Sequence, residues 1–122
     1  MFPPLSNGER RALLRIARHA ILESTVRQTT WQPEIPEGPL AELRGAFVTL
    51  HLRGKLRGCV GQLHSAAPLA RVVAHCAQMA SSEDTRFAPV AEREIADLSI
   101  EISALSDLEA LRPEDVEIGR HG

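Results

Sequence analysis

The stretch GAFVTLHLRGKLRGCVG, residues 45–61, decides the fold because it predicts a β-hairpin. Its first half is rich in residues that favour extended strands, and Gly54 marks the turn. The length of the turn sets the register of the two strands. A two-residue turn places Cys59 opposite Val48, among apolar neighbours, whereas a three-residue turn places it opposite Thr49. The residues leave both registers open.

The RGCVG motif at residues 57–61 raises the question of whether Cys59 is a reactive thiol. Gly58 and Gly61 remove side-chain cover, and in a regular strand Arg57 lies on the same face as Cys59. A guanidinium near a thiol favours the thiolate, which is the nucleophile. The alternative is a small side chain packed in a tight strand. Cys59 and Arg57 are therefore the candidate catalytic residues, and the two glycines are candidate binding residues.

Two helices are predicted on either side of this hairpin. Ser6 and Glu9 have the spacing of a capping box, which begins a helix over residues 7–28. Apolar residues three and four apart predict a second helix within SAAPLARVVAHCAQMASS, residues 65–82. Cys76 falls on the apolar stripe of that helix, so we expect it to fill the core.

A further strand is predicted near the end of the chain. LSIEISAL, residues 98–105, alternates apolar and polar side chains, which is typical of a strand with one buried face. Hairpin, helix and strand together predict an α+β class, with a mainly antiparallel sheet and flanking helices. The length fits a single domain over residues 1–122.

The segment EDTRFAPV, residues 83–90, brings a carboxylate, a guanidinium and an aromatic ring into one loop. Asp84 and Arg86 are either a pair that fixes the loop or, in a functional reading, an anion-binding group beside Cys59. Glu101 projects from the wetter face of its strand and is a candidate partner for either arginine. Asp84, Arg86 and Glu101 complete the candidate binding residues.

Composition excludes several classes of function. The net charge of −2 argues against a dedicated nucleic-acid binder. No segment approaches the ~18 apolar residues that cross a membrane. Two cysteines do not make a disulfide framework, and the spacing of the cysteines and five histidines fits no metal motif. We therefore predict a cytoplasmic protein with reduced thiols and with neither metal nor cofactor.

Taken together, five sequence blocks resemble the AMMECR domain family, whose prokaryotic members are called AmmeMemoRadiSam system protein A. The blocks are GAFVTL, LRGCVG, EDTRFAPV, IEISALS and EIGRHG, in the order and spacing of the family. The resemblance implies an α+β fold with a cleft near the RGCVG motif. It also implies association with a Memo-like protein and a radical S-adenosylmethionine (SAM) protein, and it makes Cys59 the residue suspected of function. No reaction is firmly established for the family.

The chain departs from the family pattern in three places. It reads DTRF at residues 84–87 where the family commonly has Asp-Pro-Arg-Phe, and its hairpin turn is Arg-Gly at residues 53–54 where Asn-Gly is frequent. Family members usually continue for several dozen residues beyond the position of Gly122. We therefore predict a domain truncated at the C-terminus, with an exposed apolar edge that favours self-association.

Two functions remain after this reading. The favoured one is an accessory or binding component that docks the Memo-like and radical SAM proteins or presents a small molecule. The alternative is a small enzyme that uses Cys59 as a thiolate, with Arg57 or Arg86 stabilising an anionic substrate. The first is favoured because no acid–base constellation surrounds the cysteine in the sequence.

Overall fold

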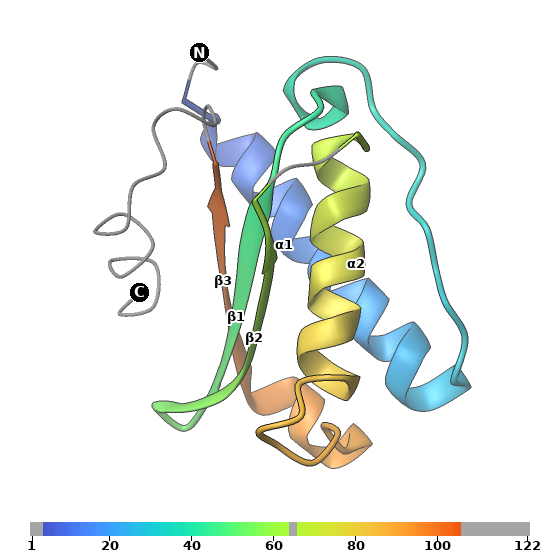
Figure 1. The fold of residues 1–122 in the computed structure, drawn as a ribbon, viewed down its shortest axis with the longest axis vertical. Helices are drawn as coiled ribbons and strands as arrows, with labels where there is room; N and C mark the ends of the chain where they lie inside the picture. The colour runs from blue at the N-terminus through green and yellow to red at the C-terminus, as the bar shows by residue number, and fades with distance from the viewer. Residues whose placement is uncertain (1–3, 64–65, 106–122) are drawn as a thin grey trace.

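The computed structural model of the chain describes residues 4–63 and 66–105 (Figure 1). Its elements, in order, are α1 (Asn7–Leu22), the π-helical turn η1 (Glu23–Arg27), the 3-10 turn η2 (Pro39–Ala41), β1 (Ala46–Leu52), β2 (Lys55–Gln62), α2 (Leu69–Ser82), the 3-10 helix η3 (Glu92–Asp97) and β3 (Leu98–Ala104). The three strands form one antiparallel sheet in the order β2-β1-β3. The predicted α+β class, with an antiparallel sheet and flanking helices, is confirmed.

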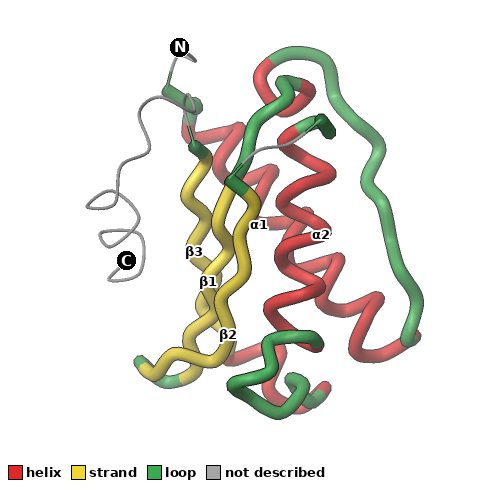
Figure 2. The backbone as a smooth tube through the Cα atoms, in the orientation of Figure 1, coloured by secondary structure: helices red, strands yellow, loops and turns green. Residues whose placement is uncertain are grey.

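Both long helices pack on the same face of this sheet, so the fold has two layers (Figures 1 and 2). Ala46, Val48 and Leu50 of the central strand point into the interface and are fully buried. Cys76 of α2 is also fully buried, as predicted, and burial raises the pKa of its thiol to about 11. The other face of the sheet carries the alternate side chains of the strands, Cys59 among them.

The first helix begins at the predicted capping box and ends earlier than predicted. The Glu9 backbone N–H donates to Ser6 Oγ at 3.1 Å, and the Ser6 N–H donates to Glu9 Oε1 at 2.7 Å. The α-helical hydrogen bonding stops at Leu22, and a π-helical turn continues to Arg27. Gln28 then adopts a left-handed conformation with φ of 56°, which reverses the chain direction.

A long extended segment, residues 28–38, follows this turn and is called the strap below. Figure 1 shows it running along the outer side of α2 to reach η2. Trp31 is half-buried, and its ring meets the His19 ring of α1 edge-on, with centroids 4.2 Å apart. Pro33 is buried, and Ile35 packs against the core. Every second residue of the strap from 31 to 35 is therefore buried or half-buried against the rest of the domain.

The hairpin combines a two-residue turn with a β-bulge, a combination that neither predicted register included. Arg53 and Gly54 both have positive φ, 51° and 82°, as a type I′ turn requires. His51 then pairs with Leu56, but Leu50 pairs with Gly58, so Arg57 is an additional residue on β2. The bulge restores the pairing of Cys59 with Thr49, which a regular two-residue hairpin would exclude.

Candidate functional site

Cys59 lies in a row of three side chains across the open face of the sheet. Thr49 of β1 pairs with Cys59 of β2 on one side and with Glu101 of β3 on the other. The Thr49 Oγ1 and Cys59 Sγ atoms are 3.2 Å apart, within hydrogen-bonding distance. Thr49 is buried, Cys59 is half-buried and Glu101 is exposed. The thiol is accessible in part, and its contact is a hydroxyl, not a base.

The backbone of Cys59 is held by the loop that follows α2. The Cys59 N–H donates to Asp84 Oδ2 at 3.0 Å, and the Cys59 carbonyl accepts a long contact of 3.5 Å from Arg86 Nη2. Both backbone groups face the outer edge of β2, because the pair with Thr49 leaves them unused by β1. The loop thus covers the edge strand at the position of the cysteine.

Asp84 is the centre of this attachment. Its Oδ1 accepts from the Arg86 backbone N–H at 3.1 Å and from Arg86 Nε at 3.0 Å, while its Oδ2 accepts from Arg86 Nη2 at 2.7 Å. The Asp84 side chain is 7% exposed, whereas that of Arg86 is 58% exposed. These hydrogen bonds, with the N–H of Cys59, hold the pKa of the Asp84 carboxyl well below its usual range. Arg86 also lies over the Phe87 ring at 5.4 Å.

The structure gives Arg57 partners other than the thiol. Its Nε and Nη2 donate to the two carboxylate oxygens of Glu94 at 3.2 and 3.0 Å. Its remaining donors reach the carbonyls of Ala88 and Pro89 at 2.7 and 3.2 Å. The prediction that Arg57 lies on the same face as Cys59 assumes a regular strand. The bulge at Arg57 breaks the regular alternation of side chains along β2. Activation of Cys59 by Arg57 stays a prediction, and the observed contacts fasten β2 to η3.

The two glycines of the motif allow close packing on opposite faces of β2. A Cβ at Gly58 would collide with the Ala80 carbonyl of α2, so this glycine lets the helix approach the strand. A Cβ at Gly61 would collide with the ring of Phe47, which covers that position. Glycine at these sites is explained by packing, and the predicted effect on exposure of the thiol is not needed to account for it.

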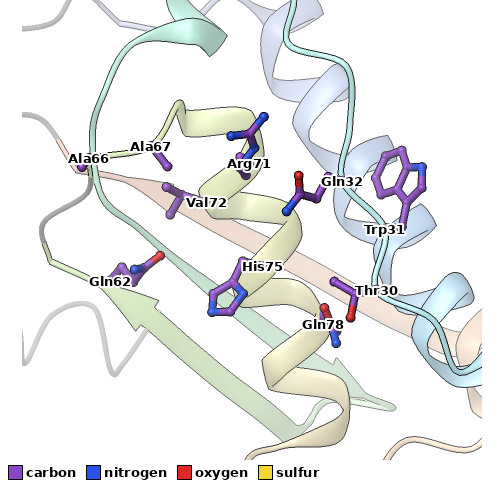
Figure 3. Close-up of a pocket in the computed structure, with 10 residues that line it drawn as sticks. All are labelled: Thr30, Trp31, Gln32, Gln62, Ala66, Ala67, Arg71, Val72, His75 and Gln78. Carbon is purple, nitrogen blue, oxygen red and sulfur yellow. The ribbon is translucent and has the colours of Figure 1, made fainter.

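A second polar surface, which the sequence reading missed, lies on α2 (Figure 3). This surface forms a cavity of about 400 Å³, which we call the α2 groove. Its lining residues are Thr30, Trp31, Gln32, Gln62, Ala66, Ala67, Arg71, Val72, His75 and Gln78. The available signal was the spacing of Arg71, His75 and Gln78, which puts all three on the side of α2 opposite its apolar stripe. The strap that closes the groove is distant in sequence, so no local pattern predicts it.

A larger cavity of about 610 Å³ lies beside β3, the strand at the other edge of the sheet. Its apolar lining includes Leu13 and Leu14 of α1 and Ile100 and Ile102 of β3. The predicted self-association would use an apolar edge of this kind, and it stays a prediction.

Two further expectations concern ions and membranes. Within residues 4–63 and 66–105, no group of three His, Cys, Asp or Glu side chains converges on a metal-sized site. In the same part of the chain, every helix is too short or too polar to cross a bilayer. Cys59 and Cys76 are both free thiols. The EIGRHG block of the resemblance lies outside the described residues.

The family profile named AMMECR1 matches residues 14–122, nearly the whole chain. The chain belongs to the AMMECR1 family. A protein from Methanothermobacter thermautotrophicus is 36% identical over 93% of this chain and 59% of its own length. A protein from Methanopyrus kandleri, MK0488, is 37% identical over 97% of this chain and 61% of its own length.

A solved structure supports the same assignment. The crystal structure of the uncharacterized protein PH0010 from Pyrococcus horikoshii matches with a TM-score of 0.69 and 33% identity. The match covers 78% of this chain and 50% of the Pyrococcus chain. The chain thus spans about 60% of the length of the two curated AMMECR1 relatives above.

Proposed function

We propose that this AMMECR1-family chain is an accessory binding component that acts with a Memo-like protein and a radical SAM protein. The observation that carries the proposal is the engagement of the RGCVG motif in structural contacts. Asp84 and Arg86 hold the backbone of Cys59, and Glu94 holds Arg57. A catalytic thiol needs a base within reach and a stabilising cation that is free to meet the substrate. Among the described residues, none contacts the Cys59 thiol as a base, and the arginines near it are already paired with carboxylates.

The surface offered to a partner is the open face of the sheet at the Cys59 row, with the adjoining edge of β2. Glu101 is exposed on that face, Arg86 is exposed at the β2 edge beside Cys59, and the two carry opposite charges. Opposite charges near a half-buried cysteine suit a protein interface, in which charge positions the partner and the centre excludes water. Asp84, Gly58 and Gly61 act indirectly by fixing this surface. We expect the protein to work in the cytoplasm.

The test is binding between purified proteins, measured by isothermal titration calorimetry. The full chain is titrated with the Memo-like and the radical SAM proteins encoded by the same genome. We expect one of them to bind, with affinity reduced about tenfold by the charge reversals Glu101→Lys and Arg86→Glu. Cys59→Ser should bind within about threefold of the unmodified chain. The control is Arg11→Glu, an exposed charge reversal on α1, which should leave binding unchanged.

Failure of both proteins to bind would contradict the accessory role. Binding that is unaffected by Glu101→Lys and Arg86→Glu would place the interface elsewhere and contradict the proposed surface. Circular dichroism of each variant separates lost binding from lost folding.

One observation favours the alternative, a cysteine-dependent enzyme. The Arg86 side chain is exposed, and its Nη2 atom lies 3.5 Å from the carbonyl oxygen of Cys59. Arg86, and not Arg57, would then be the cation that stabilises the thiolate. If this is so, Arg86→Gln should slow alkylation of Cys59 by iodoacetamide about tenfold, while Arg57→Gln should not. Equal rates in both variants would remove the enzyme hypothesis.

A further inference from the structure

The α2 groove has the properties of a preformed site for a small ligand, and it lies on the opposite side of the sheet from Cys59. Three segments distant in sequence enclose it: the strap, α2, and the end of β2 with residues 66–67 (Figure 3). Its volume of about 400 Å³ falls within the ~300–1,000 Å³ typical of small-molecule pockets. Four lining residues are apolar, namely Trp31, Ala66, Ala67 and Val72, and the other six are polar or charged.

The charge of the groove is one-sided. Arg71 and His75 are its ionisable lining residues, and the lining contains no carboxylate. In the part of the chain described, Arg71 is engaged in no ion pair, although Arg53, Arg57 and Arg86 each meet a carboxylate there. The whole chain has a net charge of −2, whereas the lining of this groove carries one arginine, one histidine and no carboxylate. An anion would supply the missing counter-charge.

The polar side chains of the groove can also recognise the shape of an anion. Arg71 and His75 are one helical turn apart on α2, on the same side of the helix. Figure 3 shows the His75 ring directed toward Gln62, and the Gln32 amide directed from the strap toward α2. A guanidinium presents a planar fork of N–H donors that matches a carboxylate or a phosphate, and amides donate to the remaining oxygens.

The strap holds its side of the groove in place before any ligand arrives. Trp31 contacts the His19 ring and Pro33 is buried, and Gln32 between them is directed toward α2. Prolines at 33, 36 and 39 restrict the backbone of this segment further. A pre-organised wall lowers the ordering cost of binding, which favours affinity for a small ligand.

We propose that the α2 groove binds a small-molecule oxyanion, a carboxylate or a phosphate ester, with Arg71 as the principal ligand-binding residue. His75 and the amides of Gln32, Gln62 and Gln78 complete the donor set. The site is independent of the partner surface at Cys59, because the two lie on opposite faces of the sheet.

The experiment is an NMR titration of the ¹⁵N-labelled full chain. The probes are inorganic phosphate, glycerol 3-phosphate and succinate, and uncharged glycerol is the negative probe. We expect saturable amide shifts in residues 30–32, 62 and 71–78 with at least one anion, and none with glycerol. Saturation by the phosphates alone identifies a phosphate site, and saturation by succinate alone identifies a carboxylate site.

The Arg71→Gln variant tests the assignment of the binding residue. Loss of a charge-assisted pair should weaken the saturating probe about tenfold or more. The matched control is Arg15→Gln, which makes the same change at an exposed position of α1 and should leave affinity unchanged. Thermal melts of both variants establish that they fold. The proposal is overturned if no anion saturates these amides, or if Arg71→Gln and Arg15→Gln bind equally well.

Discussion

The outer edge of β2 and the α2 groove differ in how their polar side chains are used. At the β2 edge, Arg57 and Arg86 each form a bidentate or multiple contact with a carboxylate, and both also reach backbone carbonyls. In the α2 groove, Arg71 faces a cavity with no carboxylate in its lining. The motif that draws attention in the sequence therefore lies where side chains hold the fold together. The proposed ligand site lies instead beside Arg71, which forms no ion pair within the described residues.

The largest effect that follows from this comparison concerns Gly58. Gly58→Ala should lower the free energy of unfolding by about 3 kcal/mol or more, because the new Cβ collides with a backbone carbonyl of α2 and the helix must move. Urea denaturation followed by circular dichroism measures the loss. The control is Gly8→Ala in the first turn of α1, where a Cβ would make only an ordinary contact with Ser6 Oγ and the change should be within about 1 kcal/mol of zero. Equal effects at the two glycines would contradict the packing role.

The next effect concerns the attachment of β2 to η3. Arg57→Gln should cost about 2 kcal/mol, because it breaks a largely buried bidentate pair and leaves Glu94 partly uncompensated. Arg53→Gln is the matched control, since its pair with Asp97 is 74% and 53% exposed and should contribute less than about 1 kcal/mol. The same denaturation experiment compares them. A larger loss at Arg53 than at Arg57 would refute this account of the β2 edge.

The β2 edge should also make stability depend on pH in the acid range. Contacts with Arg86 and Arg57 lower the pKa values of Asp84 and Glu94 respectively. Since the folded state binds protons less readily than the unfolded state, these carboxylates stabilise the fold above about pH 4, their unfolded pKa. That stability is lost as the pH falls through the lower folded values.

Urea denaturation between pH 2.5 and pH 7 should therefore show stability rising with pH, most steeply below about pH 4. Asp84→Asn should flatten the rise, whereas Glu101→Gln, which changes an exposed carboxylate, should leave it intact. An unchanged slope in Asp84→Asn would mean that the Asp84 contacts contribute nothing to the acid sensitivity.

The smallest effect on stability is expected in the α2 groove. Arg71→Gln should change the free energy of unfolding by less than about 0.5 kcal/mol, because it removes an exposed side chain that fastens no other element. Arg57→Gln makes the identical change at the β2 edge and serves as its counterpart. A destabilisation by Arg71→Gln as large as that of Arg57→Gln would erase the distinction between the two regions.

Local patterns in the sequence were sufficient for the elements and insufficient for the site. The capping box, the apolar stripe containing Cys76 and the alternation at residues 98–105 each depend on neighbours within a few positions, and each is confirmed. The two-residue turn at Gly54 was one of the registers considered, but the bulge opposite Leu50 was not. No local pattern specifies that additional residue, which changes the register of β2 at Arg57.

The contacts of the site are long-range, which explains why the sequence left the position of Arg86 beside Cys59 as one alternative and did not predict the pair of Arg57 with Glu94. Arg57 meets Glu94, which is 37 residues further along the chain, and Cys59 meets Asp84, 25 residues further. The Asp84–Arg86 pair was one of the two alternatives that the sequence left open, and the structure contains it. The groove depends on the strap crossing α2, which only the folded chain brings about.

The most direct test of the central claim is the rate of Cys59 alkylation by iodoacetamide at pH 7, in folded and urea-unfolded protein, followed by mass spectrometry of the Cys59 peptide. A structural cysteine, half-buried and in contact with Thr49, should react no faster in the folded chain than in the unfolded one. A folded-state rate about tenfold or more above the unfolded rate would show that the fold activates this thiol, and would contradict the account.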